Sequence, residues 1–220
     1  MARDTWEKLR TTIDIRKWLA VPQPRLVSNA PRIAVVKNFA SPEVCAWLIE
    51  CGRPYLKPAQ TDDPVTGKSR YEGARTNSSA ELSLAATDVI IHLMRARISA
   101  LTGPPPMAME GVAVLHYRPG EQYFPHYDFF DTDSPGYARQ VAEYGQRVLT
   151  FLGYLNDDYG GGETDFPKIG WRYKGAKGDG LFFWNIEPSG KPDRLTQHAG
   201  LSPSSGEKWL LSQWVRGRVT

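Results

Sequence analysis

The stretch GVAVLHYRPGEQYFPHYDF, residues Gly111 to Phe129, decides which kind of fold this chain adopts. It holds two apolar, aromatic-rich runs, 111–117 and 122–129, separated by the turn sequence RPGE. Runs of β-branched and aromatic residues bounded by Gly and Pro are typical of short strands. Four further runs of this kind follow, at 147–155, 180–186, 195–200 and 208–215. Six short strands joined by turns predict a β-sandwich or barrel.

The first half of the chain carries helical signals and one strand signal instead. Residues 41–52 read SPEVCAWLIECG, with Ser41 as N-cap, Pro42 at the first helical position and Gly52 as the stop. A second helical run covers 83–101, and the β-branched run 32–39 predicts a strand. We therefore expect an α+β domain in which the helices pack outside the β structure.

The chain divides into a short arm and one domain. Residues 5–19 alternate charged and apolar positions with helical spacing, and three prolines between 21 and 31 then break the pattern. We predict an amphipathic arm at 1–30 and a single domain at 31–220, helix-rich over 31–105 and with a β core over 106–220. The polar stretch 57–79 is a candidate mobile loop.

Composition and charge narrow the class of protein. The 220 residues include 27 Lys or Arg and 24 Asp or Glu, a net charge of +3, and the basic residues form no cluster that suggests a nucleic-acid partner. The N-terminus lacks the apolar core of a signal peptide, and no run approaches the roughly 18 apolar residues that span a bilayer. The two cysteines, Cys45 and Cys51, are expected to be reduced thiols. We expect a cytoplasmic protein without a membrane partner.

His126 and Asp128 form the strongest candidate for a metal site. Two positions apart in an extended strand, their side chains leave the same face within roughly 7 Å of each other. A third ligand is needed, and the remaining histidines are His92, His116 and His198. His92 lies in an apolar helical run and His116 precedes a turn, whereas His198 ends a short strand from which a hairpin would project into a barrel.

Two histidines and one carboxylate form the ligand set of non-haem Fe(II) oxygenases, which leaves positions open for a cosubstrate and dioxygen. Lys208 strengthens this interpretation, because it begins the strand that returns after His198. A buried ammonium near a metal needs an anion, which a dicarboxylate cosubstrate would supply. Trp214 shares the face of Lys208 on that strand.

An ordered set of motifs resembles the Fe(II)/2-oxoglutarate dioxygenases of the prolyl 4-hydroxylase type, over about Pro31 to Arg216. The motifs are PRIAVVKNFASPEVCAWLIE, ARTNSS, YRPGEQYFPHYDF, QRVLTFLGYLND, GGETDFP, GDGLFFWNI, HAG and GEKWLLSQWV. The resemblance implies a double-stranded β-helix, a jelly-roll or cupin-like barrel. Fe(II), 2-oxoglutarate and dioxygen are the implied cofactors and cosubstrates, with ascorbate as reductant.

The resemblance also implies roles for individual residues. The implied iron ligands are His126, Asp128 and His198. The implied contacts of 2-oxoglutarate are Lys208, at its distal carboxylate, and the hydroxyl groups of Tyr117 and Thr164. The implied substrate contacts are Tyr123, Arg147, Trp214 and, from the ARTNSS loop, Arg75. Two segments depart from the family pattern: the loop between Asp128 and Arg147 is longer, and the arm has no counterpart.

Several of these residues also have plain structural interpretations. Tyr117 and Tyr123 are suited to cross-strand packing, Trp214 to a core, Arg147 to the surface and Thr164 to a turn. The expected activity is hydroxylation of prolyl residues in a peptide or protein, coupled to decarboxylation of 2-oxoglutarate to succinate and CO2. The alternatives are a hydroxylase of a free amino acid or other small molecule, a metal-free peptide-binding module and, ranked low, a nucleic-acid demethylase.

Overall fold

The computed structural model describes residues 19–82 and 89–218. Its first large sheet contains β1 (Arg25–Asn29), β2 (Arg32–Val36), β3 (Lys57–Pro58), β6 (Ser78–Leu82), β7 (Val112–Tyr117), β9 (Arg147–Tyr154), β13 (Gly180–Trp184) and β16 (Lys208–Arg216). A smaller sheet contains β8 (Tyr123–His126), β11 (Thr164–Phe166), β12 (Trp171–Tyr173) and β14 (His198–Gly200). Two short ribbons pair β4 (Thr61–Asp62) with β5 (Ser69–Arg70) and β10 (Gly160–Gly161) with β15 (Pro203–Ser205).

Three α-helices accompany the sheets in the described part of the chain. They are α3 (Pro42–Gly52), α4 (Val89–Thr102) and α5 (Pro135–Tyr144), with single 3-10 turns at η1 (Arg53–Tyr55), η3 (Pro106–Ala108) and η4 (Arg194–Thr196). No helix among these residues is both long and apolar enough to cross a membrane. Neither Cys45 nor Cys51 forms a disulfide, as predicted.

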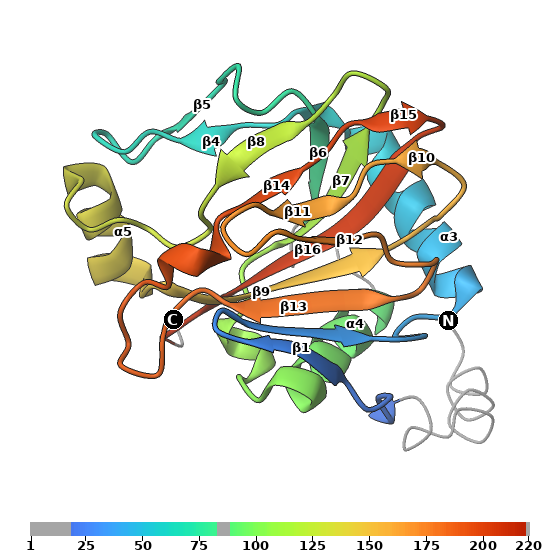
Figure 1. Ribbon diagram of the computed structural model, residues 1–220, viewed down its shortest axis with the longest axis horizontal. Coiled ribbons are helices and arrows are strands. Elements are labelled where there is room, and N and C mark those ends of the chain that lie inside the picture. Colours follow the sequence, from blue (N-terminus) through green and yellow to red (C-terminus); the bar gives the residue numbers. More distant parts are fainter. Residues whose placement is uncertain (1–18, 83–88, 219–220) are drawn as a thin grey trace, which may run out of the picture.

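The two sheets form a jelly-roll sandwich (Figure 1). The large sheet has the order β1-β2-β13-β9-β16-β7-β6-β3, and the small sheet the order β12-β11-β14-β8. All neighbouring strands run antiparallel. All six strands predicted from residue 111 onward are present, and the predicted fold class is confirmed.

Side-chain alternation along the large sheet divides the core into two layers. On β7, Val112 and Val114 pack in one cluster with Leu48 of α3 and Ile98 of α4. The alternate β7 residues, including Leu115, belong to the second cluster, between the two sheets. The sheet is therefore covered by helices on one face and by the small sheet on the other, and a site between the sheets is enclosed by two rigid layers.

The predicted start and end of α3 are both confirmed. Ser41 accepts a hydrogen bond from the Val44 amide at 3.4 Å, and Pro42 is the first helical residue. Gly52 is the last residue of α3, but its backbone stays in the right-handed helical region and the chain continues directly into η1. A Cβ on Gly52 would meet the Val114 side chain at 2.8 Å, so this glycine allows α3 to approach β7 closely.

Three further sequence predictions need correction. Residues 25–29, assigned to the arm, form β1 and pair with β2, while the predicted helical arm lies outside the described residues up to position 18. The stretch 57–79 is not simply a loop, since it contains β3, β4, β5 and the start of β6. The long loop between Asp128 and Arg147 contains helix α5. In the first two cases, pairing with another strand supplies order that the local sequence does not signal: β1 pairs with the adjacent β2, and β6 pairs with β7.

Candidate active site

Two histidines meet where β8 pairs with β14. His126 and His198 are direct partners in the antiparallel register, which places their rings side by side with centroids 4.3 Å apart. Asp128 follows two residues after the end of β8, and its carboxylate oxygens lie 3.6 Å from Nε2 of each histidine. All three ligand atoms lie within 4.8 Å of one another, close enough to share one metal ion. The predicted triad is therefore assembled.

Outer contacts orient both rings toward a common centre. Nδ1 of His126 lies 2.8 Å from the carbonyl oxygen of Phe124, and Nδ1 of His198 lies 3.1 Å from that of Thr196. An imidazole whose Nδ1–H is donated to a carbonyl presents its Nε2 lone pair to a metal. The backbone thus selects the tautomer that this site needs.

The electrostatics of the triad also suit a cation. Burial lowers the pKa of His198 to about 4, with the neighbouring His126 adding to the effect, so His198 is neutral at pH 7. Burial alone would raise the pKa of Asp128, but His198, His126 and a hydrogen bond from Thr150 hold it well below its usual range. A carboxylate and a neutral imidazole are the states in which these groups ligate metals.

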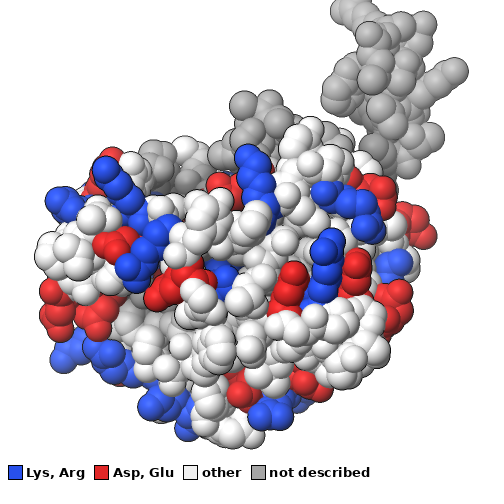
Figure 2. Space-filling model, turned by 90° about the horizontal axis from the view of Figure 1, so that it is seen from above, with Lys and Arg blue, Asp and Glu red and all other residues white. Residues whose placement is uncertain are grey.

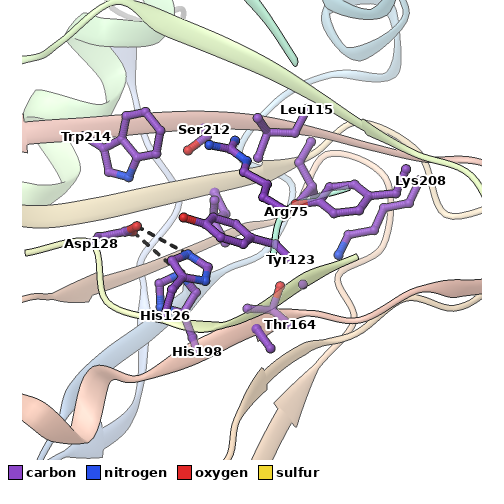
Figure 3. Close-up of a pocket in the computed structure, with 15 residues that line it drawn as sticks. Arg75, Leu115, Tyr123, His126, Asp128, Thr164, His198, Lys208, Ser212 and Trp214 are labelled. Atoms are coloured by element: carbon purple, nitrogen blue, oxygen red, sulfur yellow. Dashed lines mark ion pairs between the residues drawn. The ribbon is translucent and has the colours of Figure 1, made fainter. Parts of the chain in front are cut away.

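Lys208 lies in the same pocket as the triad (Figure 3). It begins β16 directly opposite Tyr117 of β7, is 0% exposed, and its Nζ lies 4.8 Å from the centroid of the Tyr117 ring. Nζ has no hydrogen-bond partner within 19–82 and 89–218, and burial lowers the pKa of Lys208 to about 7. A buried ammonium without a partner is costly unless an anion joins it, so this end of the pocket fits a carboxylate.

Tyr117 and Thr164 line the pocket near Lys208, as predicted. Both are buried, and burial raises the pKa of the Tyr117 hydroxyl to about 12, so it stays a donor at neutral pH. The Thr164 hydroxyl lies 2.9 Å from Oη of Tyr154, which is itself 3.3 Å from the Tyr173 carbonyl oxygen. Tyr154 has no local sequence signal, because its position beside Thr164 depends on how β9 faces the small sheet.

The predicted substrate residues stand around the metal side of the pocket. Tyr123 stacks on His126 with ring centroids 3.4 Å apart, and the Arg75 guanidinium lies 4.7 Å from the Tyr123 ring centre. The Arg147 guanidinium lies 4.1 Å from the centre of the Trp214 ring. The Arg75–Tyr123 and Arg147–Trp214 pairs border the triad, and each pair joins side chains from different segments of the chain.

Arg147 is held more tightly than the sequence suggested. Its Nε and Nη2 donate to the two carboxylate oxygens of Glu110 at 2.7 and 2.8 Å. Burial opposes the charge of Arg147, but Glu110 outweighs it and raises the pKa of the guanidinium. Glu110 also pairs with Arg216 at 2.5 Å. Glu110, which the sequence analysis missed, therefore fixes the guanidinium on which Trp214 stacks.

A large groove of about 1070 Å³ opens beside the triad. Its walls come from the segment 55–81, from the region between β8 and α5, and from Glu110, Arg147, Trp214 and Arg216. Figure 2 looks onto the side of the molecule that carries β4, β5 and β8, and acidic and basic side chains are interspersed over it. A groove of this volume and mixed charge has room for a chain longer than a single amino acid.

The β4–β5 hairpin and α5 are joined across one end of this groove. The Gly136 amide donates to the Pro64 carbonyl at 2.9 Å, and the Tyr137 hydroxyl donates to the Asp62 carbonyl at 2.9 Å. Gln140 adds a hydrogen bond to the Gly67 carbonyl at 3.3 Å. A Cβ on Gly136 would collide with the Gly67 backbone, so the missing side chain permits this contact.

Comparison with known proteins decides the family. Residues 112–216 match the sequence profile of the 2OG-Fe(II) oxygenase superfamily. The chain is 37% identical over 212 residues to prolyl 4-hydroxylase 1 of Arabidopsis thaliana, an alignment that covers 90% of this chain and 73% of that protein. The chain belongs to the prolyl 4-hydroxylase family.

Other members of the prolyl 4-hydroxylase family give the same result. Prolyl 4-hydroxylase subunit alpha-1 of Gallus gallus is 35% identical over 190 residues, which cover 86% of this chain and 36% of the relative. The viral collagen prolyl hydroxylase of Paramecium Bursaria Chlorella virus-1, solved as a 2OG complex, superposes with a TM-score of 0.66 at 27% identity and covers 87% of this chain and 99% of that one. This protein is thus an Fe(II)- and 2-oxoglutarate-dependent dioxygenase.

The structure also separates the family's triad from the other two histidines. His116 lies on β7 next to Tyr117 but faces the opposite side of the sheet, where its ring stacks on Trp209 and its Nε2 lies 3.1 Å from Glu207. His92 is on α4 and exposed. Neither reaches the pocket, as the analysis of their sequence positions had favoured.

Proposed function

We propose that this protein hydroxylates prolyl residues within a peptide or protein. The observation that carries the proposal is the groove of about 1070 Å³ beside the triad, whose lining includes Arg75, Tyr123, Arg147 and Trp214. A hydroxylase of free amino acids needs a closed pocket lined with charges for the substrate's own ammonium and carboxylate groups. The prolyl 4-hydroxylases among the relatives support the same choice of substrate.

In this proposal the residues of the pocket divide by role. The iron ligands are His126, Asp128 and His198. Lys208 holds the far carboxylate of 2-oxoglutarate, and the hydroxyl groups of Tyr117 and Thr164 contact the same molecule. When bound, iron supplies the activation of dioxygen that couples decarboxylation of 2-oxoglutarate to hydroxylation of a C–H bond.

The chain's own contribution is geometry, charge and exclusion of water. His126, His198 and Lys208 are fixed by strand pairing on opposite sheets, so metal and cosubstrate are held by rigid elements. Tyr123, stacked on His126, and Trp214, stacked on Arg147, would confine the target proline next to the metal. Arg75 extends this wall, and its own Nη1 is anchored to the Gln60 carbonyl at 2.8 Å.

A comparison of substrates tests this proposal. Proline-containing peptides should drive succinate release with a kcat/KM at least about 100-fold above that of free proline, because groove contacts away from the reacting carbon add binding energy. The measurement is succinate release over a panel of peptides, with the same peptides carrying alanine in place of proline as control. Preference for free proline, or equal turnover of the alanine peptides, would contradict the proposal.

The junction between α5 and the hairpin yields a second prediction. Gly136→Val should push the β4–β5 hairpin away from α5 and raise the KM for peptide about 5- to 30-fold, as expected for losing one or two hydrogen bonds of about 1 kcal/mol each. The KM for 2-oxoglutarate should not change, because Lys208 lies at the other end of the site. Steady-state kinetics with both substrates measure this.

Gly73→Val is the matched control for this prediction. A Cβ on Gly73 meets nothing within 4 Å, so the same change in the polar segment 57–79 should leave both KM values intact. Equal peptide KM values for the two variants would show that the junction does not shape the groove.

A further inference from the structure

A chain of buried hydrogen bonds stands behind the Asp128 carboxylate. The Thr150 hydroxyl on β9 lies 2.6 Å from Oδ2 of Asp128, and Nδ2 of Asn185 lies 3.0 Å from that hydroxyl. Thr150 and Asn185 are both 0% exposed, and Asp128 is 5% exposed. Water therefore does not compete for these contacts, and each one is more consequential than on the surface.

The direction of this chain is fixed by its chemistry. An ionised carboxylate only accepts hydrogen bonds, so Thr150 must donate its single hydroxyl proton to Asp128. The Thr150 oxygen is then left as an acceptor, and the Asn185 amide nitrogen is the donor that reaches it. Asn185 thereby holds the Thr150 hydroxyl in the rotamer that serves Asp128.

Asp128 depends on this chain because strand pairing does not hold it. β8 ends at His126, and Asp128 lies in the connection to α5. By contrast, His126 and His198 are held by the β8–β14 register as well as by their Nδ1 contacts. Among the described residues, Thr150 is the hydrogen-bond donor to the Asp128 side chain, beside the two imidazoles 3.6 Å away.

Asn185 is also linked to the other side of the triad through its backbone. Its carbonyl oxygen accepts from the Asp193 amide at 2.9 Å, and the Asp193 carbonyl accepts from the Thr196 amide at 3.1 Å and hydroxyl at 2.6 Å. The Thr196 carbonyl in turn contacts Nδ1 of His198. Asn185 therefore links the contacts that hold Asp128 to those that hold His198, although it lies 12 residues or more from either ligand in sequence.

We propose that Thr150 and Asn185 are positioning residues that fix the orientation of the Asp128 carboxylate for iron. Neither touches the metal in this arrangement. Thr150 occupies Oδ2 with a hydrogen bond, so the carboxylate keeps one rotamer and one plane, and Asn185 prevents the hydroxyl from turning away. The inference rests on the proposed iron site and adds to it the source of its geometry.

Thr150→Val tests the inference, because valine keeps the shape of threonine and removes the hydroxyl. Affinity for Fe(II), titrated anaerobically by calorimetry without substrate, should fall about 10- to 100-fold, the usual effect of losing an outer partner of a ligand. Thr150→Ser, which restores the hydroxyl, should bind nearly as tightly as the native protein. Asn185→Ala should weaken Fe(II) binding in the same direction.

Two controls separate positioning from general destabilisation. Thr102→Val makes the same change in α4, where the hydroxyl bonds the Ile98 carbonyl far from the triad, and should leave Fe(II) affinity unchanged. Thermal unfolding of each metal-free variant, monitored by circular dichroism, verifies that the variant is folded. If Thr150→Val does not fold, the Fe(II) affinity of Asn185→Ala decides whether the inference holds. Native Fe(II) affinity in the folded variants, or equal loss in Thr150→Ser and Thr150→Val, would overturn the inference.

His126→Ala distinguishes failure of this inference from failure of the proposed iron site. If that variant still binds Fe(II) as the native protein does, the site itself is wrong. If it loses Fe(II) while Thr150→Val and Asn185→Ala bind normally, the site stands and only the positioning role falls.

Discussion

His126→Ala is expected to remove tight Fe(II) binding and to reduce peptide-driven succinate release by at least about 1000-fold. The triad has three protein ligands within 4.8 Å, so losing one leaves an imidazole and a carboxylate that cannot hold the ion in place. A metal contributes several kcal/mol to the reaction it promotes, and each 1.36 kcal/mol is a tenfold change in rate. Anaerobic Fe(II) titration and succinate release measure the two effects.

His116→Asn is the matched control for this variant. His116 is a buried histidine on the neighbouring strand β7, but it faces Trp209 and Glu207 on the helix side of the sheet. Its loss should change stability without changing Fe(II) affinity. If His126→Ala retained native activity, or if His116→Asn lost Fe(II) to the same extent, the assignment of the metal ligands would be wrong.

Lys208→Met should raise the concentration of 2-oxoglutarate needed for activity by roughly 30-fold to several thousand-fold, while Fe(II) still binds. Methionine keeps most of the side-chain volume but removes the ammonium, and truncating one partner of a buried charge pair costs about 2–5 kcal/mol. The partner that loses its contact here is the far carboxylate of the cosubstrate. The KM for 2-oxoglutarate is the measurement, and Lys168→Met, at an exposed position between β11 and β12, is the control.

The pH dependence of 2-oxoglutarate binding gives Lys208 a second readout. Burial lowers the pKa of Lys208 to about 7 in the free protein, and the groups that face it are Tyr117, Thr164 and, at longer range, Glu163. Only the protonated ammonium binds the carboxylate, so affinity should decline as the pH rises above about 7 and should stay flat in Lys208→Met. A native protein with pH-independent binding, or a methionine variant with native affinity, would show that Lys208 does not hold the cosubstrate.

The site residues that the sequence predicts correctly are those whose placement follows from the residue pattern along a single strand. Alternation along β16 placed Lys208 and Trp214 on one face, and both line the pocket. The two-residue spacing placed His126 and Asp128 together, and the hairpin position of His198 selected it over His116. Alternation with a period of two is a local property of one strand, so it can be predicted without knowing the order of the other strands.

The supporting residues were not predictable, because they depend on strand order and register. Thr150 and Asn185 reach Asp128 only because β9 and β13 are neighbours beneath the small sheet, and Glu110 meets Arg147 from the segment before β7. None of these pairings has a sequence signature at short range. They follow from the order β13-β9-β16-β7 in the large sheet.

Helix α5 is different, since its signals were present in the sequence. Ser134 precedes Pro135 at the first helical position, and Gly145 follows the helix with a left-handed backbone, the same punctuation that identified the start of α3. The helix is short and polar, so its periodicity is weak, and the segment was treated as a long loop. Its contact with the β4–β5 hairpin forms part of the groove lining.

Mass spectrometry of a proline-containing peptide incubated with the protein, Fe(II), 2-oxoglutarate and dioxygen tests the account most directly. The account predicts that the prolyl residue gains one oxygen atom in step with the succinate released, and that this gain disappears with His126→Ala. Succinate release without oxygen on the peptide, oxygen on a residue other than proline, or an equal gain with His126→Ala would contradict it.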